Sequence, residues 1–153
     1  MHPTQEPADR DDLSPADVLR FAALYVQRHG FHQGDMFASL TTPTPPACAQ
    51  GAVKMVICGN PQAAYTPDEA VLFDETNRAL ARHLDREYLG WEHDPTGVPA
   101  APHALVAEWN DEDGRTADEL VTAMTDAADE YDTRQAHLKA AYAPVCPTTV
   151  GGA

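Results

Sequence analysis

The sequence predicts an all-α protein, an irregular orthogonal bundle of three main helices and two short ones, with room for a minor short β element. Three stretches place Ser or Thr three residues before an acidic residue, which is the pattern that caps helix N-termini. Apolar residues then recur at intervals of three and four, as on the buried face of a helix. Alternating strand patterns are too few to build a sheet.

The length of 153 residues and an apolar content of 43% indicate one globular domain with its own core. Residues 1–12 are polar and contain two prolines, so we expect a flexible N-terminal segment. The helical domain is predicted to span residues 13–142. Residues 143–153, with two further prolines, are predicted to form a flexible tail.

The first main helix is predicted to begin at Ser14-Pro15-Ala16-Asp17, which combines a cap, a proline at the first helical position and an acid, and to end at Gly30. A short helix is expected from about Ala47 to Cys58, after a proline-rich loop. For residues 52–58 a strand is the alternative, because short apolar runs fit both structures.

The second main helix is predicted to begin at Thr66-Pro67-Asp68-Glu69 and to end at Gly90. A loop rich in proline follows, and residues 103–109 form a short element that is either helical or extended. The last main helix is predicted to run from Thr116 towards Ala141, and its first turn carries acids that suit the helix dipole.

The stretch from Trp109 to Thr116 joins the short element to the last helix. Its Asn, Asp and Gly residues are typical of turns, so Trp109 is expected to be an anchor just before a tight turn. A calcium loop starting at Asp111 would place Arg115 and Thr122 at ligand positions. We therefore predict no metal site, and no cofactor.

The chain carries 24 acidic and 10 basic residues, for a net charge of −14. This charge disfavours direct binding to nucleic acid, although a DNA mimic that occupies a DNA-binding protein would also be acidic. High solubility is the simpler explanation. No membrane-spanning run and no signal peptide are visible, and the three cysteines have no framework spacing, so a cytoplasmic protein is expected.

Four short motifs follow one another along the chain: Gln33-Gly34, Cys48 with Gly51-Ala52, Trp109-Asn110-Asp111, and Arg115-Thr116. This succession resembles a family of small uncharacterised proteins of actinobacteria and their phages, over roughly residues 14 to 130. The resemblance implies an actinobacterial or phage origin. It carries no activity, and it gives no residue a role.

One functional alternative is a cysteine-dependent hydrolase or transferase. Cys48 is expected at the start of a helix, where the dipole lowers the pKa of a thiol. His103 is the candidate base, Asn110 its orienting partner and Gln33 an oxyanion donor, in the chain order of papain-like enzymes. Those enzymes hold the histidine on a sheet, which this sequence does not predict. The competing interpretation makes Cys48 a small buried apolar residue.

The leading prediction is a non-enzymatic cytoplasmic protein that binds or regulates another protein, with a basic protein as one candidate partner. The expected binding surfaces are the acidic last helix and the region around Trp109 to Arg115. Trp91 and Trp109 flank the proline-rich loop and serve either as pocket walls or as core anchors. The candidate binding residues are Trp91, Trp109, Asp111, Arg115, Asp118, Glu119, Asp126, Asp129 and Glu130.

Overall fold

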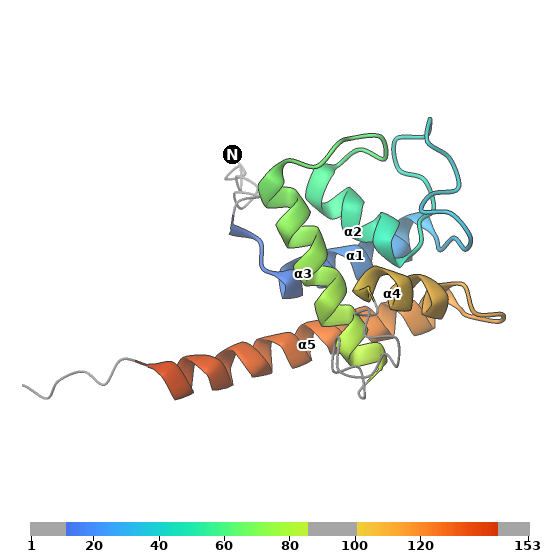
Figure 1. The fold of residues 1–153 in the computed structure, drawn as a ribbon. Coiled ribbons are helices and arrows are strands. Elements are labelled where there is room, and N and C mark those ends of the chain that lie inside the picture. The colour runs from blue at the N-terminus through green and yellow to red at the C-terminus, as the bar shows by residue number, and fades with distance from the viewer. Residues whose placement is uncertain (1–11, 86–100, 144–153) are drawn as a thin grey trace, which may run out of the picture.

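The computed structural model describes residues 12–85 and 101–143, and within them it confirms the predicted all-α class. Five helices and no strand occur in these ranges (Figure 1). Backbone pairing of the β type is limited in these ranges to two isolated bridges, which join Ala47 to Phe31 and to Phe37. The helices are α1 (Pro15–His29), α2 (Ala49–Cys58), α3 (Pro67–Leu84), α4 (Pro102–Asn110) and α5 (Ala117–Tyr142).

The three predicted capping patterns all form. In each case the Ser or Thr side chain accepts a hydrogen bond from the backbone three residues on, and the acid of that residue accepts one from the cap. These caps satisfy N–H groups that have no partner inside their own helix. The caps are Ser14 for α1, Thr66 for α3 and Thr116 for α5.

Both ambiguous segments are helical. Residues 52–58 belong to α2, which ends where Gly59 adopts a left-handed conformation with φ 71°. Residues 103–109 belong to α4, whose first residue is Pro102, a position at which a missing N–H costs nothing.

The predicted end of α3 at Gly90 is wrong. The helix ends at Leu84, because Asp85 turns to an extended backbone with φ −130° and ψ 101°. The N–H of Asp85 still donates to the carbonyl oxygen of Ala81 at 3.0 Å. The chain therefore leaves this helix without a glycine, and Gly90 itself lies outside the described residues.

The core forms where α1 packs along α5, with α3 crossing both (Figure 1). Small and β-branched residues of α1 meet Leu120, Met124 and their neighbours on α5, and these side chains are fully buried. Small side chains let the two helix axes approach closely. Within the described residues, no helix combines the length and apolar character needed to cross a bilayer.

Candidate functional site

Two loops meet at one end of the bundle, and we name this region the loop corner: residues 31–48 and residues 110–116. Asn110, the last residue of α4, is 1% exposed and lies at its centre. Its Oδ1 accepts from the backbone N–H of Ala49 at 2.9 Å. Its Nδ2 donates to the carbonyl oxygen of His32 at 3.3 Å and to Asp111 Oδ1 at 2.9 Å. One buried amide thus joins three segments.

Two further contacts hold the loops together. Gln33 Nε2 donates to the carbonyl oxygens of Asn110 and Glu112, both at 3.0 Å. The backbone N–H of Gly34 donates to Asp111 Oδ1 at 3.0 Å. The Gly34 hydrogen bond, followed by that of Asn110, lowers the pKa of the Asp111 carboxyl from its ordinary value, since both favour the charged form.

Arg115 fixes the turn between α4 and α5. Its guanidinium lies over the ring of Trp109, 3.9 Å from the ring centroid. Its Nε donates to the Trp109 carbonyl oxygen at 2.9 Å, and its terminal nitrogens bind the carboxylates of Glu112 and Glu119. Arg115 and Trp109 are therefore structural partners, and the predicted role of Trp109 as an anchor before a tight turn matches its position.

Cys48 is the N-cap of α2, so it lies at the start of a helix as predicted. Its Sγ accepts from the N–H of Gly51 at 3.3 Å, and the side chain is buried. Burial raises the pKa of the thiol, and this outweighs the backbone hydrogen bonds that lower it. The direction is opposite to the one that a nucleophilic thiolate requires.

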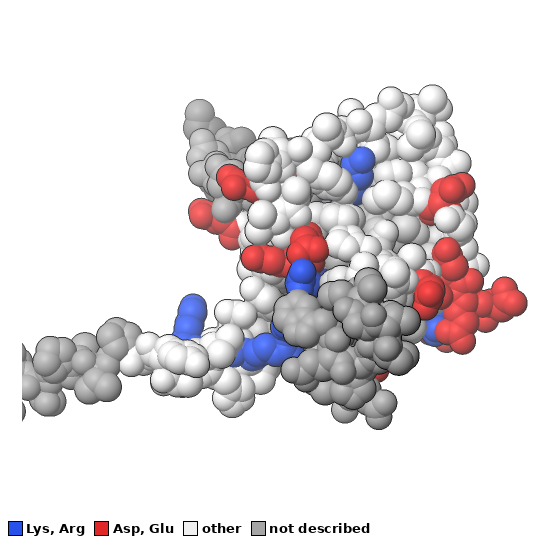
Figure 2. All heavy atoms as spheres, in the orientation of Figure 1, with Lys and Arg blue, Asp and Glu red and all other residues white. Residues whose placement is uncertain are grey.

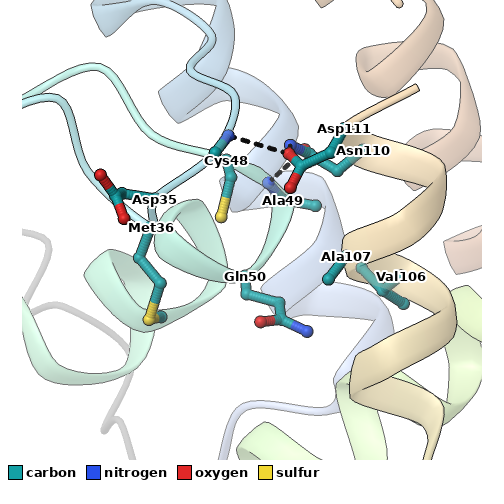
Figure 3. Close-up of a pocket in the computed structure, with 10 residues that line it drawn as sticks. Asp35, Met36, Cys48, Ala49, Gln50, Val106, Ala107, Asn110 and Asp111 are labelled. Carbon is teal, nitrogen blue, oxygen red and sulfur yellow. Dashed lines mark hydrogen bonds between the residues drawn. The ribbon is translucent and has the colours of Figure 1, made fainter. Parts of the chain in front are cut away.

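A small cleft of about 60 Å³ opens at the loop corner (Figure 3). This volume suits a single side-chain group and is far below the roughly 300 Å³ at which sites for drug-sized ligands begin. The carboxylates of Asp35 and Asp111 stand on opposite sides of the cleft in Figure 3. The lining residues are Gly34, Asp35, Met36, Cys48, Ala49, Gln50, Val106, Ala107, Asn110 and Asp111.

The structure brings Cys48, Asn110 and Gln33 to the loop corner, but His103 does not line the cleft. The His103 ring stacks on Phe73 with 5.4 Å between centroids, and its Nε2 lies 3.7 Å from Asp74 Oδ1. The backbone carbonyl oxygen of His103 accepts a hydrogen bond at 2.7 Å from Nε2 of Gln50, which is one of the residues that line the cleft. Among the described residues, no histidine lines the cleft that contains Cys48.

The acidic residues predicted on the last helix fall into two groups. Three of them make hydrogen bonds within the chain: Glu119 with Arg115 and with the backbone of the α5 cap, Asp129 with Arg20, and Glu130 with His83. The other two, Asp118 and Asp126, are exposed and make no ion pair within the described residues. Trp91, the remaining predicted binding residue, lies outside those residues.

Asp35 and Gln50 also line the cleft, and neither is among the predicted catalytic or binding residues. Asp35 follows a glycine in a turn-forming stretch, but no local spacing indicates that this loop faces α4. No group of His, Cys, Asp and Glu suited to hold a metal occurs in residues 12–85 and 101–143.

Comparisons with curated proteins and with solved structures give no match. One family model, described as a family of unknown function (DUF6197), matches residues 10–130. That span covers most of the chain and includes every residue of the loop corner. The chain therefore belongs to the family of unknown function DUF6197.

Proposed function

We propose that this chain is a non-enzymatic protein-binding module that holds a basic segment of its partner at the loop corner. The proposal rests on one observation: hydrogen bonds fix the two loops of the loop corner, and two carboxylates on these loops have no ion-pair partner within the described residues. Asn110, Gln33 and Asp111 tie the two loops together, while the carboxylates of Asp35 and Asp113 are exposed and make no ion pair within the described residues.

Preorganisation supports this function. A loop that is already fixed loses little conformational freedom on binding, so more of the contact energy appears as affinity. Functional residues commonly lie on loops that a rigid scaffold positions. Figure 2 shows acidic side chains gathered at the end of the molecule where α4 turns into α5. Such a surface attracts Lys and Arg side chains and speeds their encounter.

The acidic last helix is the weaker of the two predicted surfaces. Glu119, Asp129 and Glu130 already bind partners within the chain, and a ligand would have to break those bonds. Only Asp118 and Asp126 remain to meet a cation. These two residues instead provide a matched control for the loop corner, because they are exposed and carry the same charge.

The cysteine-dependent enzyme is less well supported. Its nucleophile would be Cys48, the buried N-cap of α2, whose pKa is raised by burial and beside which no histidine of the described residues lines the cleft. The second alternative, a DNA mimic, predicts that the chain displaces a DNA-binding protein from DNA and that added salt weakens this displacement. We place the proposed binding in the cytoplasm, as the sequence predicts, and the resemblance implies that the protein comes from an actinobacterium or from one of its phages.

A random-peptide display library, selected on the purified chain, tests the proposal. We expect the enriched peptides to be rich in Lys and Arg. Their capture should fail on a bait with Asp35→Lys and Asp113→Lys and should persist on one with Asp118→Lys and Asp126→Lys. Enrichment of peptides without basic residues would contradict the proposal. Loss on the second bait alone would assign binding to the last helix.

A further inference from the structure

The last two turns of α5 project from the bundle. Every residue from Ala136 to Tyr142 is exposed, and Figure 1 shows this part of the helix continuing beyond the other elements. Leu138 is 44% exposed and Tyr142 is 81% exposed. A short helical segment that packs on nothing is marginally stable in water. We name residues 134–142 the α5 arm, and its exposed apolar side chains, Leu138 and Tyr142, are available to pack against another surface.

The α5 arm differs in charge from the rest of the molecule. Residues 133–142 contain Arg134 and Lys139 and no acidic residue, in a chain whose net charge is −14. Arg134, Leu138 and Tyr142 are spaced by four residues and share one face of the helix. This face therefore combines apolar and basic side chains, and it suits a surface that is apolar and acidic.

A groove of about 450 Å³ beside α3 is lined by both apolar and acidic side chains. Apolar side chains line it, including Leu13, Leu72 and Val71, of which Val71 is 56% exposed. Asp68 and Glu75 also line it, and neither makes a hydrogen bond or ion pair within the described residues. We name it the α3 groove. Its volume falls within the range of about 300–1,000 Å³ that accommodates several bulky groups.

One end of the groove lies near the part of α5 that precedes the arm. Burial raises the pKa of the Tyr131 phenol, and the nearby charge of Glu75 raises it further, so Glu75 of the groove lies near the residues just before the arm. In Figure 1 the arm leaves the bundle towards the side where α3 begins. The arm is an unbroken continuation of α5, so it reaches the groove of its own chain only if that helix breaks. A second copy presents the same groove without this cost.

We propose that the chain forms a two-fold symmetric homodimer in which the α5 arm of each copy lies in the α3 groove of the other. Leu138 and Tyr142 cover Val71 and Leu72, while Arg134 and Lys139 face Asp68 and Glu75. Because each copy gives an arm and receives one, the assembly closes at two subunits.

Charge favours the α3 groove over the exposed apolar side chains of α1. Phe21 and Leu24 on α1 are 51% and 43% exposed. Arg28 is exposed one turn beyond Leu24, whereas Arg20 is already paired with Asp129 and Asp132. A basic arm would be repelled there, whereas the α3 groove attracts it.

A charge exchange tests the proposal by sedimentation equilibrium of the full chain. The wild type is expected to dimerise. The arm variant Arg134→Glu, Lys139→Glu and the groove variant Asp68→Lys, Glu75→Lys should each weaken the dimer by at least about tenfold. An equimolar mixture should recover a heterodimer, since acidic arms then meet basic grooves and basic arms meet acidic grooves. The control Asp118→Lys, Asp126→Lys should dimerise as the wild type does.

Three results would overturn the proposal. They are a monomeric wild type at roughly 100 µM, unchanged dimers in both variants, or a mixture that stays monomeric. Far-ultraviolet circular dichroism of each variant establishes that it is folded. This matters most for the groove variant, because Asp68 lies in the first turn of α3, where a lysine opposes the helix dipole.

Discussion

Asn110 Oδ1 accepts a hydrogen bond from the backbone N–H of Ala49 at 2.9 Å, and both residues are buried. Ala49 is the first residue of α2, so its N–H has no partner within the helix. Asn110 ends α4, so one side chain joins the start of one helix to the end of another. This bond fixes the relative position of the two loops that form the loop corner.

Replacing Asn110 with Ala should lower the free energy of unfolding by about 2–3 kcal/mol. The substitution leaves the Ala49 N–H and the His32 carbonyl oxygen without their partner in a buried place. Urea unfolding at pH 7 measures the loss.

Asn60→Ala provides the matched control. Asn60 is exposed, and its side chain accepts a single local hydrogen bond, from the N–H of Gln62, within the described residues. Its loss should cost no more than about 0.5 kcal/mol. Equal losses for the two variants would show that the Asn110 hydrogen bonds do not stabilise the corner.

The charge of Asp111 gives a pH-dependent prediction. Its folded pKa lies below the unfolded value of about 3.9, so its contribution to stability is fully present above that value. The contribution disappears as the pH falls through the folded pKa. Asp111→Asn keeps an acceptor and removes the charge, so it should cost about 0.5–1 kcal/mol at pH 7 after allowance for solvent screening. The difference from wild type should shrink below about pH 4.

Asp113→Asn serves as the reference for this experiment, because it removes the same charge from an exposed side chain without a partner within the described residues. Urea unfolding of the three proteins between pH 3 and pH 7 separates the local bond from general charge repulsion. A cost for Asp111→Asn that equals that of Asp113→Asn at every pH would contradict the account.

Gly51 should not tolerate alanine, although alanine usually stabilises a helix by about 0.5–1 kcal/mol relative to glycine. A Cβ at Gly51 would stand 2.1 Å from the carbonyl oxygen of Met36. That oxygen accepts from the Cys48 N–H at 2.9 Å, so the loop backbone must shift. We expect Gly51→Ala to cost about 2–3 kcal/mol, measured as a lower melting temperature.

Gly114→Ala tests a different cause at the same corner. Gly114 has φ 81° and open space around its Cα, so only the backbone strain of a left-handed residue is added. The expected cost is about 1 kcal/mol. If Gly51→Ala proved as mild as Gly114→Ala, the close approach of Met36 to α2 would be disproved.

Cys48 should react slowly with iodoacetamide at neutral pH, because it is buried and its pKa is raised. Its labelling should require a higher pH than that of an exposed thiol, because burial opposes formation of the thiolate. Cys58 is partly exposed and should be modified first of the two. Mass-spectrometric mapping of labelled peptides measures both rates. Fast labelling of Cys48 below pH 7 would instead favour the cysteine-dependent enzyme.

Local signals predicted most of the fold. The helix starts at Ser14, Thr66 and Thr116 depend on contacts across three residues, which the sequence displays directly. The end of α3 was predicted wrongly, because the backbone becomes extended at Asp85 and no glycine or proline at that position indicates the end of the helix.

The site was predicted only in part. Asn110, Asp111 and Gln33 were selected for other roles, and their true partners lie far away along the chain. The bond from Ala49 to Asn110 joins residues 61 positions apart, and that from Gly34 to Asp111 joins residues 77 apart. No periodicity or motif contains such a pair, since tertiary packing alone brings the residues together. The predicted order of Cys48, His103 and Asn110 likewise carried no information on where the His103 ring points.

The most direct test of the loop corner as a binding surface is the affinity of one selected basic peptide, measured by isothermal titration calorimetry. The account predicts that Asp35→Lys with Asp113→Lys weakens binding at least about tenfold, or about 1.4 kcal/mol. It predicts little change for Asp118→Lys with Asp126→Lys, although both pairs alter the net charge equally. An equal loss in both variants would show that the peptide responds to overall charge and that the loop corner is not its site.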